Sequence, residues 1–512
     1  MEKITSMLKT QPFAHQIRAF EKAQLTNVFA NFSDQGTGKT WSSIAEIFAL
    51  AQLGKIDRVL ILAPKGVDAN WTNIELPVHA PDEAAIVALW RPKETKKWKE
   101  EMTNFFASKQ VKILAMNWDA IAFKRGYEVA EWFLSCGSGM IIADESQRIK
   151  NPKAKRTKAA LKLAAKAKFK RILTGTPATR APFDLWSQFA FLDERILNIP
   201  SYRAFCCRHA VMASGSDYEM IAIKQKIKQK IKRQYLNANQ EMIERLVNKR
   251  TPLIVKRDVN GAPMYLKLEE IQQKIEQHSF RVTKEECLDL PSKIYTQMFF
   301  ELTTQQQKIY NELKYKLRLI LDDDTIQPLI KLTALQKMSQ VCSGYFITQE
   351  GSTEKIEGAN PKLQLLEEKL NGTPTIIWSI MRQESNDIVT VCKKLQLNYV
   401  EYHGEINDKD KAEAIKKFQD GTAQIFIGRQ QSAGLGLTLT AAQEVIYYSN
   451  SFNLEHRLQS EDRAHRIGQT TKVLYTDLIA EHTVECEMIR ALQRKDDMAR
   501  ILVGDQLRQW LV

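Results

Sequence analysis

SDQGTGKT, residues 33–40, is the stretch of the sequence that decides the fold. Its small residues let backbone N–H groups converge on a phosphate chain, Lys39 is placed to reach the β and γ phosphates, and the Thr40 hydroxyl can bind magnesium. The strict form of such a loop begins with glycine, whereas this one begins with Ser33. A chance surface turn is the alternative. We interpret the stretch as a phosphate-binding loop because a matching acidic motif follows it.

That acidic motif ends the apolar run GMIIADE, residues 139–145. Adjacent carboxylates at the end of a buried strand are costly unless metal or hydrogen bonds compensate them. We therefore expect Asp144 to hold magnesium through its water shell, and Glu145 to orient and deprotonate an attacking water. A helix-capping acidic pair is the alternative, and the phosphate loop upstream argues against it.

Strand-like runs recur on both sides of this motif and predict an α/β fold. Short β-branched runs that are separated by helical lengths and end in Gly, Pro, Asp or Ser are typical of parallel sheets with helices on both faces. The runs are VLILAP (59–64), VKILAM (111–116), RILTGTP (171–177), PTIIWS (374–379), LNYVEYHG (397–404), AQIFIG (423–428), EVIYYSN (444–450) and KVLYTDLI (472–479).

Between the two sets of runs, from about residue 192 to 338, the rhythm is lost and helical segments such as QEMIERLVNKR (240–250) and TTQQQKIYNELKYKLRLIL (303–321) take over. We therefore predict a first lobe over residues 1–195, mostly helical protrusions and a linker over 196–345, a second α/β lobe over 346–483, and a C-terminal helical segment over 484–512.

Two arginines in QSEDRAHRIGQ, residues 459–469, are candidates for the second lobe's part in catalysis. Arg463 and Arg466 are three residues apart, which on a helix puts them on one face. Phosphoryl transfer needs positive charge where negative charge builds up on the γ phosphate. An arginine pair is usually a solvated surface feature, but its position after the strand runs of a second lobe favours a catalytic role.

The bulk composition narrows the class of partner. The chain has 512 residues, a formal net charge of +14 and a pI near 9.2, which favours a polyanionic partner. No apolar run approaches the roughly 20 residues that span a bilayer, and the start of the chain lacks the apolar core of a secretory signal. We therefore expect a cytoplasmic protein with no membrane contact. Its seven scattered cysteines lack metal-ligand spacing, and in a reducing compartment we expect them to be free structural thiols.

Taken together, the motifs are similar to those of the Swi/Snf-like branch of helicase superfamily 2, in the right order along nearly the whole chain. PFAHQ resembles the motif that reads adenine, which implies that role for Gln16, and DQGTGKT resembles the family's phosphate loop. The resemblance then implies ATP contacts for Gly36, Thr37, Gly38, Lys39 and Thr40.

Three further stretches of the first lobe resemble family motifs that couple the ATP site to the nucleic acid. They are LILAPKGVDANW (60–71), DESQRIKN (144–151) and LTGTPATR (173–180), and DLWSQFAFL (184–192) follows as in the family. The coupling residues implied by the resemblance are Lys65, Trp71, Gln147, Lys150, Asn151, Thr174, Thr176 and Arg180.

The second lobe continues the match with YHGEI (402–406), SAGLGLTLTAA (432–442) and FNLEHRLQSEDRAHRIGQ (452–469), of which the last is the most specific. The resemblance implies ATP contacts for Gly434 and Gly436 and a coupling role for Gln459. The long helical insertion also fits the family, with landmarks LIVKRDV (253–259), LPSK (290–293), QQKIY (306–310) and LQKMSQVCSG (335–344).

This resemblance implies two RecA-like lobes, ATP and Mg²⁺ as cofactors, and duplex DNA as the track. The chain departs from the family pattern at Gln147 for histidine, Gln35 for a hydrophobic residue, Arg180 for asparagine and Leu454 for proline. None of these changes removes a catalytic charge. Those at Gln147 and Arg180 put the coupling to DNA, rather than hydrolysis, in question.

Two basic runs are candidates for the nucleic-acid track. RIKNPKAKRTKAALKLAAKAKFKR (148–171) has no acidic residue and adjoins a motor motif, which favours phosphate contact. KQKIKQKIKR (224–233) is either a second contact on a protrusion or a flexible basic loop. No base-reading signature is evident, so the track should be read without sequence specificity.

The sequence thus predicts a DNA-stimulated ATPase that translocates on duplex DNA, although the residues alone do not separate DNA from RNA. The alternatives are a strand-separating DNA or RNA helicase and a catalytically silent clamp. Intact Lys39, Asp144, Glu145, Arg463 and Arg466 argue against the clamp. No chromatin-reading, nuclease or zinc module is evident, which favours a bacterial or viral setting, and protein partners stay open.

Overall fold

The structure is a computed structural model that describes residues 8–493 except 94, 179–180, 214–217, 235–238, 252, 257–262, 288, 323–327, 349–351 and 432–436. The chain groups into two compact units. Unit 1 comprises Met1–Phe32, Trp41–Ala63 and Glu75–Arg281, and unit 2 comprises Ser33–Thr40, Pro64–Ile74 and Val282–Val512. Within the described ranges, no helix has the length and apolar character needed to cross a membrane. All seven cysteines are free thiols.

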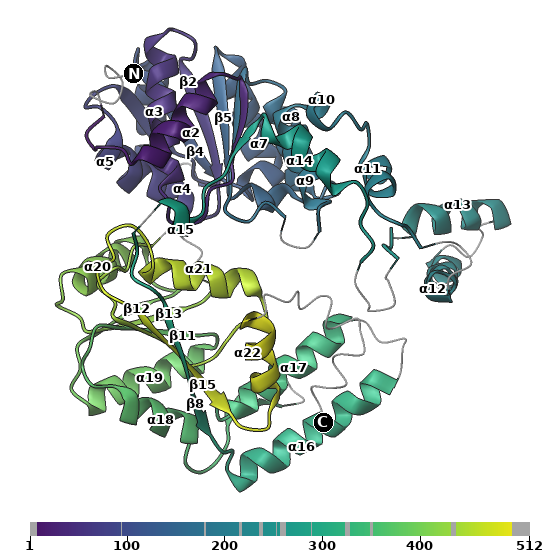
Figure 1. Ribbon diagram of the computed structural model, residues 1–512, viewed down its shortest axis with the longest axis vertical. Helices are drawn as coiled ribbons and strands as arrows, with labels where there is room; N and C mark the ends of the chain where they lie inside the picture. Colours follow the sequence, from purple (N-terminus) through teal and green to yellow (C-terminus); the bar gives the residue numbers. More distant parts are fainter. Residues whose placement is uncertain are drawn as a thin grey trace. The chain divides into compact units, whose positions relative to one another are not determined.

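Unit 1 is built on a seven-stranded sheet in the order β3-β4-β2-β5-β6-β1-β7, and every neighbouring pair is parallel (Figure 1). All six residues of β2 are buried, as expected of a central strand that is covered on both faces. The strands are β1 (Val28–Asn31), β2 (Arg58–Ala63), β3 (Ala85–Leu89), β4 (Val111–Asn117), β5 (Gly139–Asp144), β6 (Phe169–Leu173) and β7 (Ser279–Phe280).

Helices along this part of the chain cover the sheet with amphipathic faces. Helix α8, for example, buries Thr157, Ala160, Leu163 and Ala164, which recur at helical spacing. The helices are α2 (Ala14–Gln24), α3 (Lys39–Gln52), α5 (Leu76–His79), α6 (Lys96–Ala107), η2 (Ala120–Ala122), α7 (Lys124–Ser135), η3 (Ser146–Ile149), α8 (Lys155–Ala164), α9 (Asp184–Leu192), α10 (Glu194–Leu197), α11 (Tyr202–His209) and α14 (Leu268–Glu276). The short helix α4 (Val67–Asn70) and most of η1 (Trp71–Glu75) fall in the Pro64–Ile74 segment that groups with unit 2.

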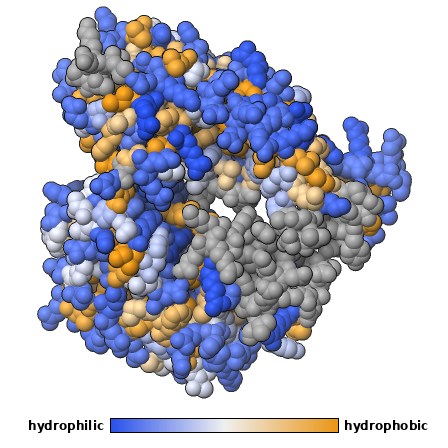
Figure 2. All heavy atoms as spheres, viewed as in Figure 1, coloured by the Kyte–Doolittle hydropathy of each residue, from blue (hydrophilic) through white to orange (hydrophobic). Residues whose placement is uncertain are grey.

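Two more helices of unit 1, α12 (Tyr218–Gln234) and α13 (Gln240–Arg250), form a hairpin that lies beyond α11 (Figure 1). They pack through a small apolar cluster of Ile231, Ile243 and Val247. Figure 2 shows the viewed side of this hairpin as largely hydrophilic. The basic run 224–233 is therefore helical and packed, which excludes the flexible loop that the sequence left open.

Unit 2 contains a six-stranded sheet in the order β12-β13-β11-β14-β15-β8, again parallel throughout. Alternate residues face opposite sides, because the side-chain period of a strand is two. Trp378 and Tyr447 lie in one buried cluster, whereas Ile377 and Ile446 lie in another. The strands are β8 (Ile294–Phe300), β11 (Thr375–Ser379), β12 (Tyr399–Tyr402), β13 (Ile425–Arg429), β14 (Glu444–Tyr447) and β15 (Leu474–Ala480).

The helices of unit 2 include a separate apolar layer that α16, α17 and α22 form around Tyr310, Leu335 and Met488. The Val484 amide at the start of α22 donates to the Tyr310 hydroxyl at 2.7 Å. A short antiparallel pair, β9 (Tyr345–Ile347) and β10 (Thr353–Lys355), follows α17. The helices are α15 (Lys284–Cys287), α16 (Thr304–Asp322), α17 (Pro328–Cys342), α18 (Pro361–Lys369), α19 (Arg382–Lys394), α20 (Asp408–Gln419), α21 (Leu454–Ala464) and α22 (Val484–Gln493).

The predicted α/β class, with two parallel sheets and helices between and after them, is confirmed. Each of the eight strand-like runs contains or overlaps an observed strand. Several strands were not expected, and two of them, β7 and β8, lie inside the span predicted to be mostly helical. Strand β8 pairs with β15 along its whole length.

Candidate active site

The predicted phosphate loop connects β1 to α3. Gly36 and Gly38 have φ of +80° and +77°, a left-handed conformation that glycine adopts without strain. The Lys39 ammonium donates to the backbone oxygens of Ser33 at 2.8 Å and Asp34 at 2.9 Å, so it lies over the loop. Because Lys39 and Thr40 begin α3, the unsatisfied amides of that helix start at this point.

Helix α3 is anchored to residues near the beginning of the chain. The Trp41 indole donates to the Thr10 hydroxyl at 3.1 Å, and the Ser42 hydroxyl donates to the Gln16 backbone oxygen at 3.1 Å. Gln16 itself is buried, and its side-chain oxygen accepts from the Phe13 amide at 2.8 Å. Its side-chain oxygen therefore caps α2, a contact that the predicted adenine-reading role did not anticipate.

Asp144 and Glu145 stand at the carboxyl end of β5 in unit 1. Asp144 Oδ1 accepts from the Glu145 amide at 2.9 Å, and the Asp144 backbone oxygen accepts from the Trp118 indole at 2.9 Å. Glu145 has φ of +51°, which is uncommon and strained for a residue with a side chain. Such strain persists only where surrounding structure enforces it, and it is often found at functional sites.

Gln147, where the family pattern has histidine, lies in η3 and is buried. Its Nε2 donates to Glu145 Oε2 at 2.8 Å. The side chain therefore contacts the carboxylate that we expect to orient water. This gives the coupling role predicted for Gln147 a direct route to Glu145.

A bridge between the acidic motif and the LTGTP motif was missed by the sequence reasoning. Buried Gln188 of α9 accepts from the Ser146 hydroxyl at 2.7 Å and donates to the Pro177 backbone oxygen at 2.6 Å. In the LTGTP motif, Thr174 Oγ1 accepts from the Thr176 amide at 3.0 Å. The available signal was the position of Gln188 in DLWSQFAFL, whose placement after LTGTP fits the family.

Other predicted coupling residues occupy varied positions. Trp71 is fully buried in η1, and Lys65 lies exposed just before α4. The Lys150 backbone oxygen accepts from the Ser187 hydroxyl at 3.4 Å, and Asn151 Oδ1 accepts from the Lys153 amide at 3.0 Å. Arg180, Gly434 and Gly436 lie outside the described residues.

The expectation that Arg463 and Arg466 share one helical face is wrong, because α21 ends at Ala464. The Arg463 backbone oxygen accepts from the Leu439 amide at 2.9 Å, which diverts it from a helical bond, and Gly468 turns the chain with φ of +97°. Arg463 is therefore on the last turn of α21, with Gln459 one turn earlier. Arg466 follows the helix, and its Nη1 donates to the Leu437 backbone oxygen at 3.1 Å.

The basic run 148–171 divides into an exposed face and a buried end. Lys155, Lys158 and Lys162 are exposed on the side of α8 opposite its buried residues, and Lys166 is exposed just after the helix. Arg171 differs, because its side chain is 1% exposed, pairs with Glu46 and donates to backbone oxygens such as that of Asn27. Phosphate contact through Arg171 is thus excluded by its burial.

Two known protein domains match most of the sequence. Residues 31–344 match the SNF2-related domain, and residues 360–468 match the helicase conserved C-terminal domain. The chain is 26% identical to an uncharacterized ATP-dependent helicase of Mycoplasma genitalium over 94% of this chain and 41% of the relative. It is 25% identical to the putative ATP-dependent helicase/translocase YwqA of Bacillus subtilis over 93% of this chain and 46% of the relative.

The chain thus spans less than half the length of these two relatives. Among solved structures, the Sulfolobus solfataricus SWI2/SNF2 ATPase core in complex with dsDNA is 24% identical and covers 98% of this chain and 95% of its own, with a TM-score of 0.39. Since the SNF2-related model alone matches more than half of the sequence, the chain belongs to the SNF2-related family.

Proposed function

We propose that this chain hydrolyses ATP to ADP and phosphate and uses the energy to move along duplex DNA without reading its sequence. The observation that carries the proposal is the loop between β1 and α3, where two left-handed glycines precede Lys39 at the start of a helix. The Lys39 ammonium donates to the backbone oxygens of Ser33 and Asp34, which places its charge over the loop. A nucleotide phosphate is a stronger partner for that charge.

The residues present also fit magnesium. Thr40 offers a hydroxyl oxygen and Asp144 a carboxylate, which are the hard oxygen donors that Mg²⁺ prefers. When bound with ATP, the ion would neutralise charge on the β and γ phosphates. We assign Glu145 to orienting and deprotonating water, with Gln147 positioning its carboxylate through the 2.8 Å hydrogen bond.

We assign Arg463 and Arg466 to stabilising the charge that develops on the γ phosphate. Their different positions, one on α21 and one after it, support a division of labour. Arg466 is tied to the Leu437 backbone in the segment that follows Gly434 and Gly436, and we propose that this segment contacts ATP as well. The roles of Arg180, Gln459 and the other coupling residues remain predictions.

The exposed lysines of α8 support a polyanionic track. Lys155, Lys158 and Lys162 lie on one face of the helix, next to the motif that contains Lys150 and Asn151. Lys224, Lys228 and Lys232 follow one another at four-residue spacing along α12. Neither helix offers a pattern that reads base edges, so we infer backbone contact.

The experiment that tests this function compares ATP turnover with duplex DNA, single-stranded DNA, RNA and no nucleic acid. We expect the largest stimulation with duplex DNA, and no turnover from Lys39→Ala under any condition. A triplex-displacement assay beside a forked-duplex assay then separates translocation from unwinding. Stimulation by RNA alone, or unwinding of the forked duplex, would contradict the proposal. Absence of ATP turnover under all four conditions would instead support the alternative of a catalytically silent clamp.

A further inference from the structure

Helix α21 carries Gln459 and Arg463, and it is fixed to the sheet of unit 2 by a buried network of charges. Arg457, on the same helix, forms a fork with Asp477 of β15, where Nη1 donates to Oδ1 and Nη2 donates to Oδ2 at 3.1 Å. Its guanidinium carbon also lies 3.5 Å from the centre of the Tyr447 ring on β14. Both members of the pair are almost fully buried.

Glu461, one turn along from Arg457, joins the helix to β8. Glu461 Oε1 accepts from Arg457 Nε at 2.8 Å, while its Oε2 accepts from Lys293 Nζ at 2.9 Å and from the Tyr295 hydroxyl at 2.8 Å. Burial alone would raise the pKa of Glu461, but the charges of Lys293 and Arg457 outweigh it and lower the pKa to about 2. The positive charges of Arg457 and Lys293 therefore neutralise the negative charges of Glu461 and Asp477 inside unit 2.

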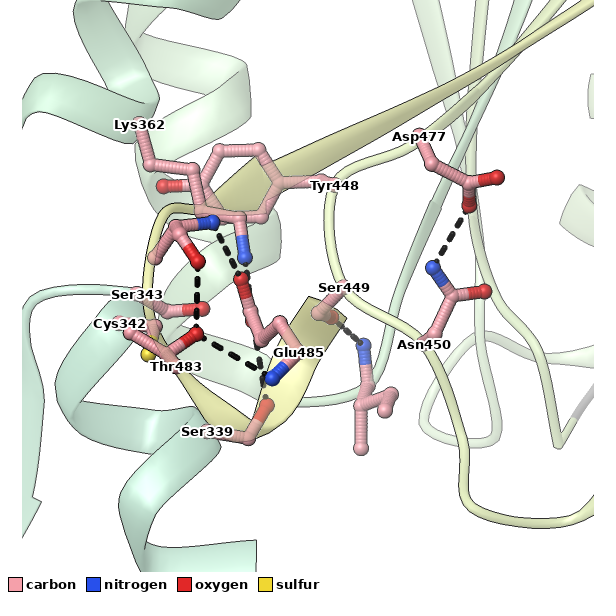
Figure 3. A network of polar contacts seen from close by, with 12 residues as sticks. Ser339, Cys342, Ser343, Lys362, Tyr448, Ser449, Asn450, Asp477, Thr483 and Glu485 are labelled. Atoms are coloured by element: carbon pink, nitrogen blue, oxygen red, sulfur yellow. Dashed lines mark hydrogen bonds and ion pairs between the residues drawn. The ribbon is translucent and has the colours of Figure 1, made fainter. Parts of the chain in front are cut away.

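The network also extends toward the segment expected to contact ATP. Asn450 Oδ1 accepts from Arg457 Nη1 at 2.8 Å and from Gln430 Nε2 at 3.4 Å. Asn450 Nδ2 donates to Asp477 at 2.8 Å, a bond drawn in Figure 3. Gln430 follows β13 and stands four residues before Gly434. The Arg457 guanidinium thus joins α21 to two strands directly, and Asn450 links it to Gln430.

We infer that Arg457 is a positioning residue for ATP hydrolysis, which holds α21 in the one placement where Arg463 and Arg466 act together. A planar guanidinium suits this task because its N–H donors point in fixed directions, so that hydrogen bonds to several partners restrict both the position and the orientation of the side chain. Arg457 has no contact with phosphate in this role. The inference rests on the proposed ATPase function and adds a residue that none of the expected motif roles includes.

Another buried ion pair of the same unit provides a matched control. Lys362 Nζ donates to Glu485 Oε1 at 2.7 Å, and the Ser339 hydroxyl donates to the same carboxylate at 3.3 Å (Figure 3). Lys362 is 0% exposed, so its loss leaves a buried carboxylate just as the loss of Arg457 does. The pair fixes α18 to α22 rather than α21.

The test measures kcat and KM for ATP with saturating duplex DNA, together with thermal midpoints, for Arg457→Met, Arg457→Lys, Asp477→Asn and Lys362→Met. Small displacements of catalytic groups are costly, so we expect Arg457→Met to lower kcat by about tenfold or more while KM changes little. Arg457→Lys should recover part of the loss. Lys362→Met should lower the thermal midpoint comparably and leave kcat near that of the wild type.

Amide hydrogen exchange provides a readout that needs no activity. Exchange in residues 454–464 should accelerate in Arg457→Met and stay unchanged in Lys362→Met. Equal loss of kcat in both variants, or normal kcat and exchange in a folded Arg457→Met protein, overturns the inference. If Arg457→Met does not fold, Arg457→Lys and Asp477→Asn decide by the same criteria. A wild-type protein without turnover would instead count against the proposed function, and exchange would still test the network.

Discussion

The acidic motif after β5 and the arginine helix α21 are held in opposite ways. Asp144 and Glu145 are fixed by backbone conformation and by neutral donors, namely the Glu145 amide, the Trp118 indole and the Gln147 amide. Helix α21 is fixed by full charges through Arg457 and Glu461. We therefore expect substitution of the Asp144 and Glu145 carboxylates to affect catalysis more than folding, whereas changes around α21 should affect both.

A large loss of ATP turnover is expected when either of the arginines at the end of α21 is removed. Arg463→Ala and Arg466→Ala should each lower ATP turnover by roughly 10³-fold, the lower end for arginines that stabilise a phosphoryl transition state. ATP binding should remain, as measured with a fluorescent nucleotide. The exposed Arg490, which pairs only locally with Glu487, provides the control as Arg490→Ala. Weakened nucleotide binding with normal turnover would assign these arginines a different role.

The charged network should also make unit 2 sensitive to acid. Because the pKa of Glu461 is lowered to about 2 in the folded protein, its contribution to stability is present above the unfolded pKa near 4.5 and is lost as pH falls toward 2. The contribution is about 3 kcal/mol. The difference in unfolding free energy between wild type and Glu461→Gln should therefore shrink between pH 4.5 and 2. A difference that does not vary with pH would refute the assignment.

A smaller effect is expected where unit 1 relies on neutral bonds. Gln188→Leu removes both the Ser146 and Pro177 contacts and should cost about 1 to 3 kcal/mol of stability. It should also reduce the stimulation of hydrolysis by DNA more than its basal rate. The control is Gln306→Leu, which removes a similarly buried bond to the Val341 backbone oxygen. Equal loss of stimulation in both proteins would show that stability alone is responsible.

The smallest effect on catalysis is expected from the exposed face of α8. Substitution by glutamine of Lys155, Lys158 and Lys162 on this face, together with Lys166 just after the helix, should reduce the salt dependence of duplex binding by a slope of about 3 to 4, since each phosphate contact contributes about 0.9. The rate at saturating DNA should stay near that of the wild type. The same substitution at the exposed Lys393, Lys394, Lys409 and Lys416 is the matched control. Identical slopes for the two proteins would remove α8 from the track.

Much of the fold followed from local pattern, because apolar runs with turn residues mark buried parallel strands. Strand β8 escaped because it is an edge strand whose apolar residues are interrupted by Thr296 and Gln297, and because it lies in a span dominated by helical segments. The end of α21 escaped because a tertiary contact, Leu439 with Arg463, interrupts the helix where the sequence favours continuation. Local pattern carries no information about such contacts.

The candidate site shows the same division. Its motif residues were predicted by type and order, yet the partners that hold them come from distant parts of the chain. Arg457 and Asp477 pair across 20 residues, and Ser146 and Gln188 across 42. Burial of Arg171 against Glu46 likewise depends on packing, which is why a basic run read as one surface divides into two parts.

Hydrolysis of ATP at Glu145 is tested by Glu145→Gln, assayed with saturating ATP and duplex DNA. The substitution keeps an oxygen that can accept from Gln147, so folding and ATP binding should persist while steady-state turnover falls by about 10² to 10⁴-fold. Glu128→Gln, which changes an exposed carboxylate of α7, should leave turnover intact. Normal turnover in a folded Glu145→Gln protein would contradict the account.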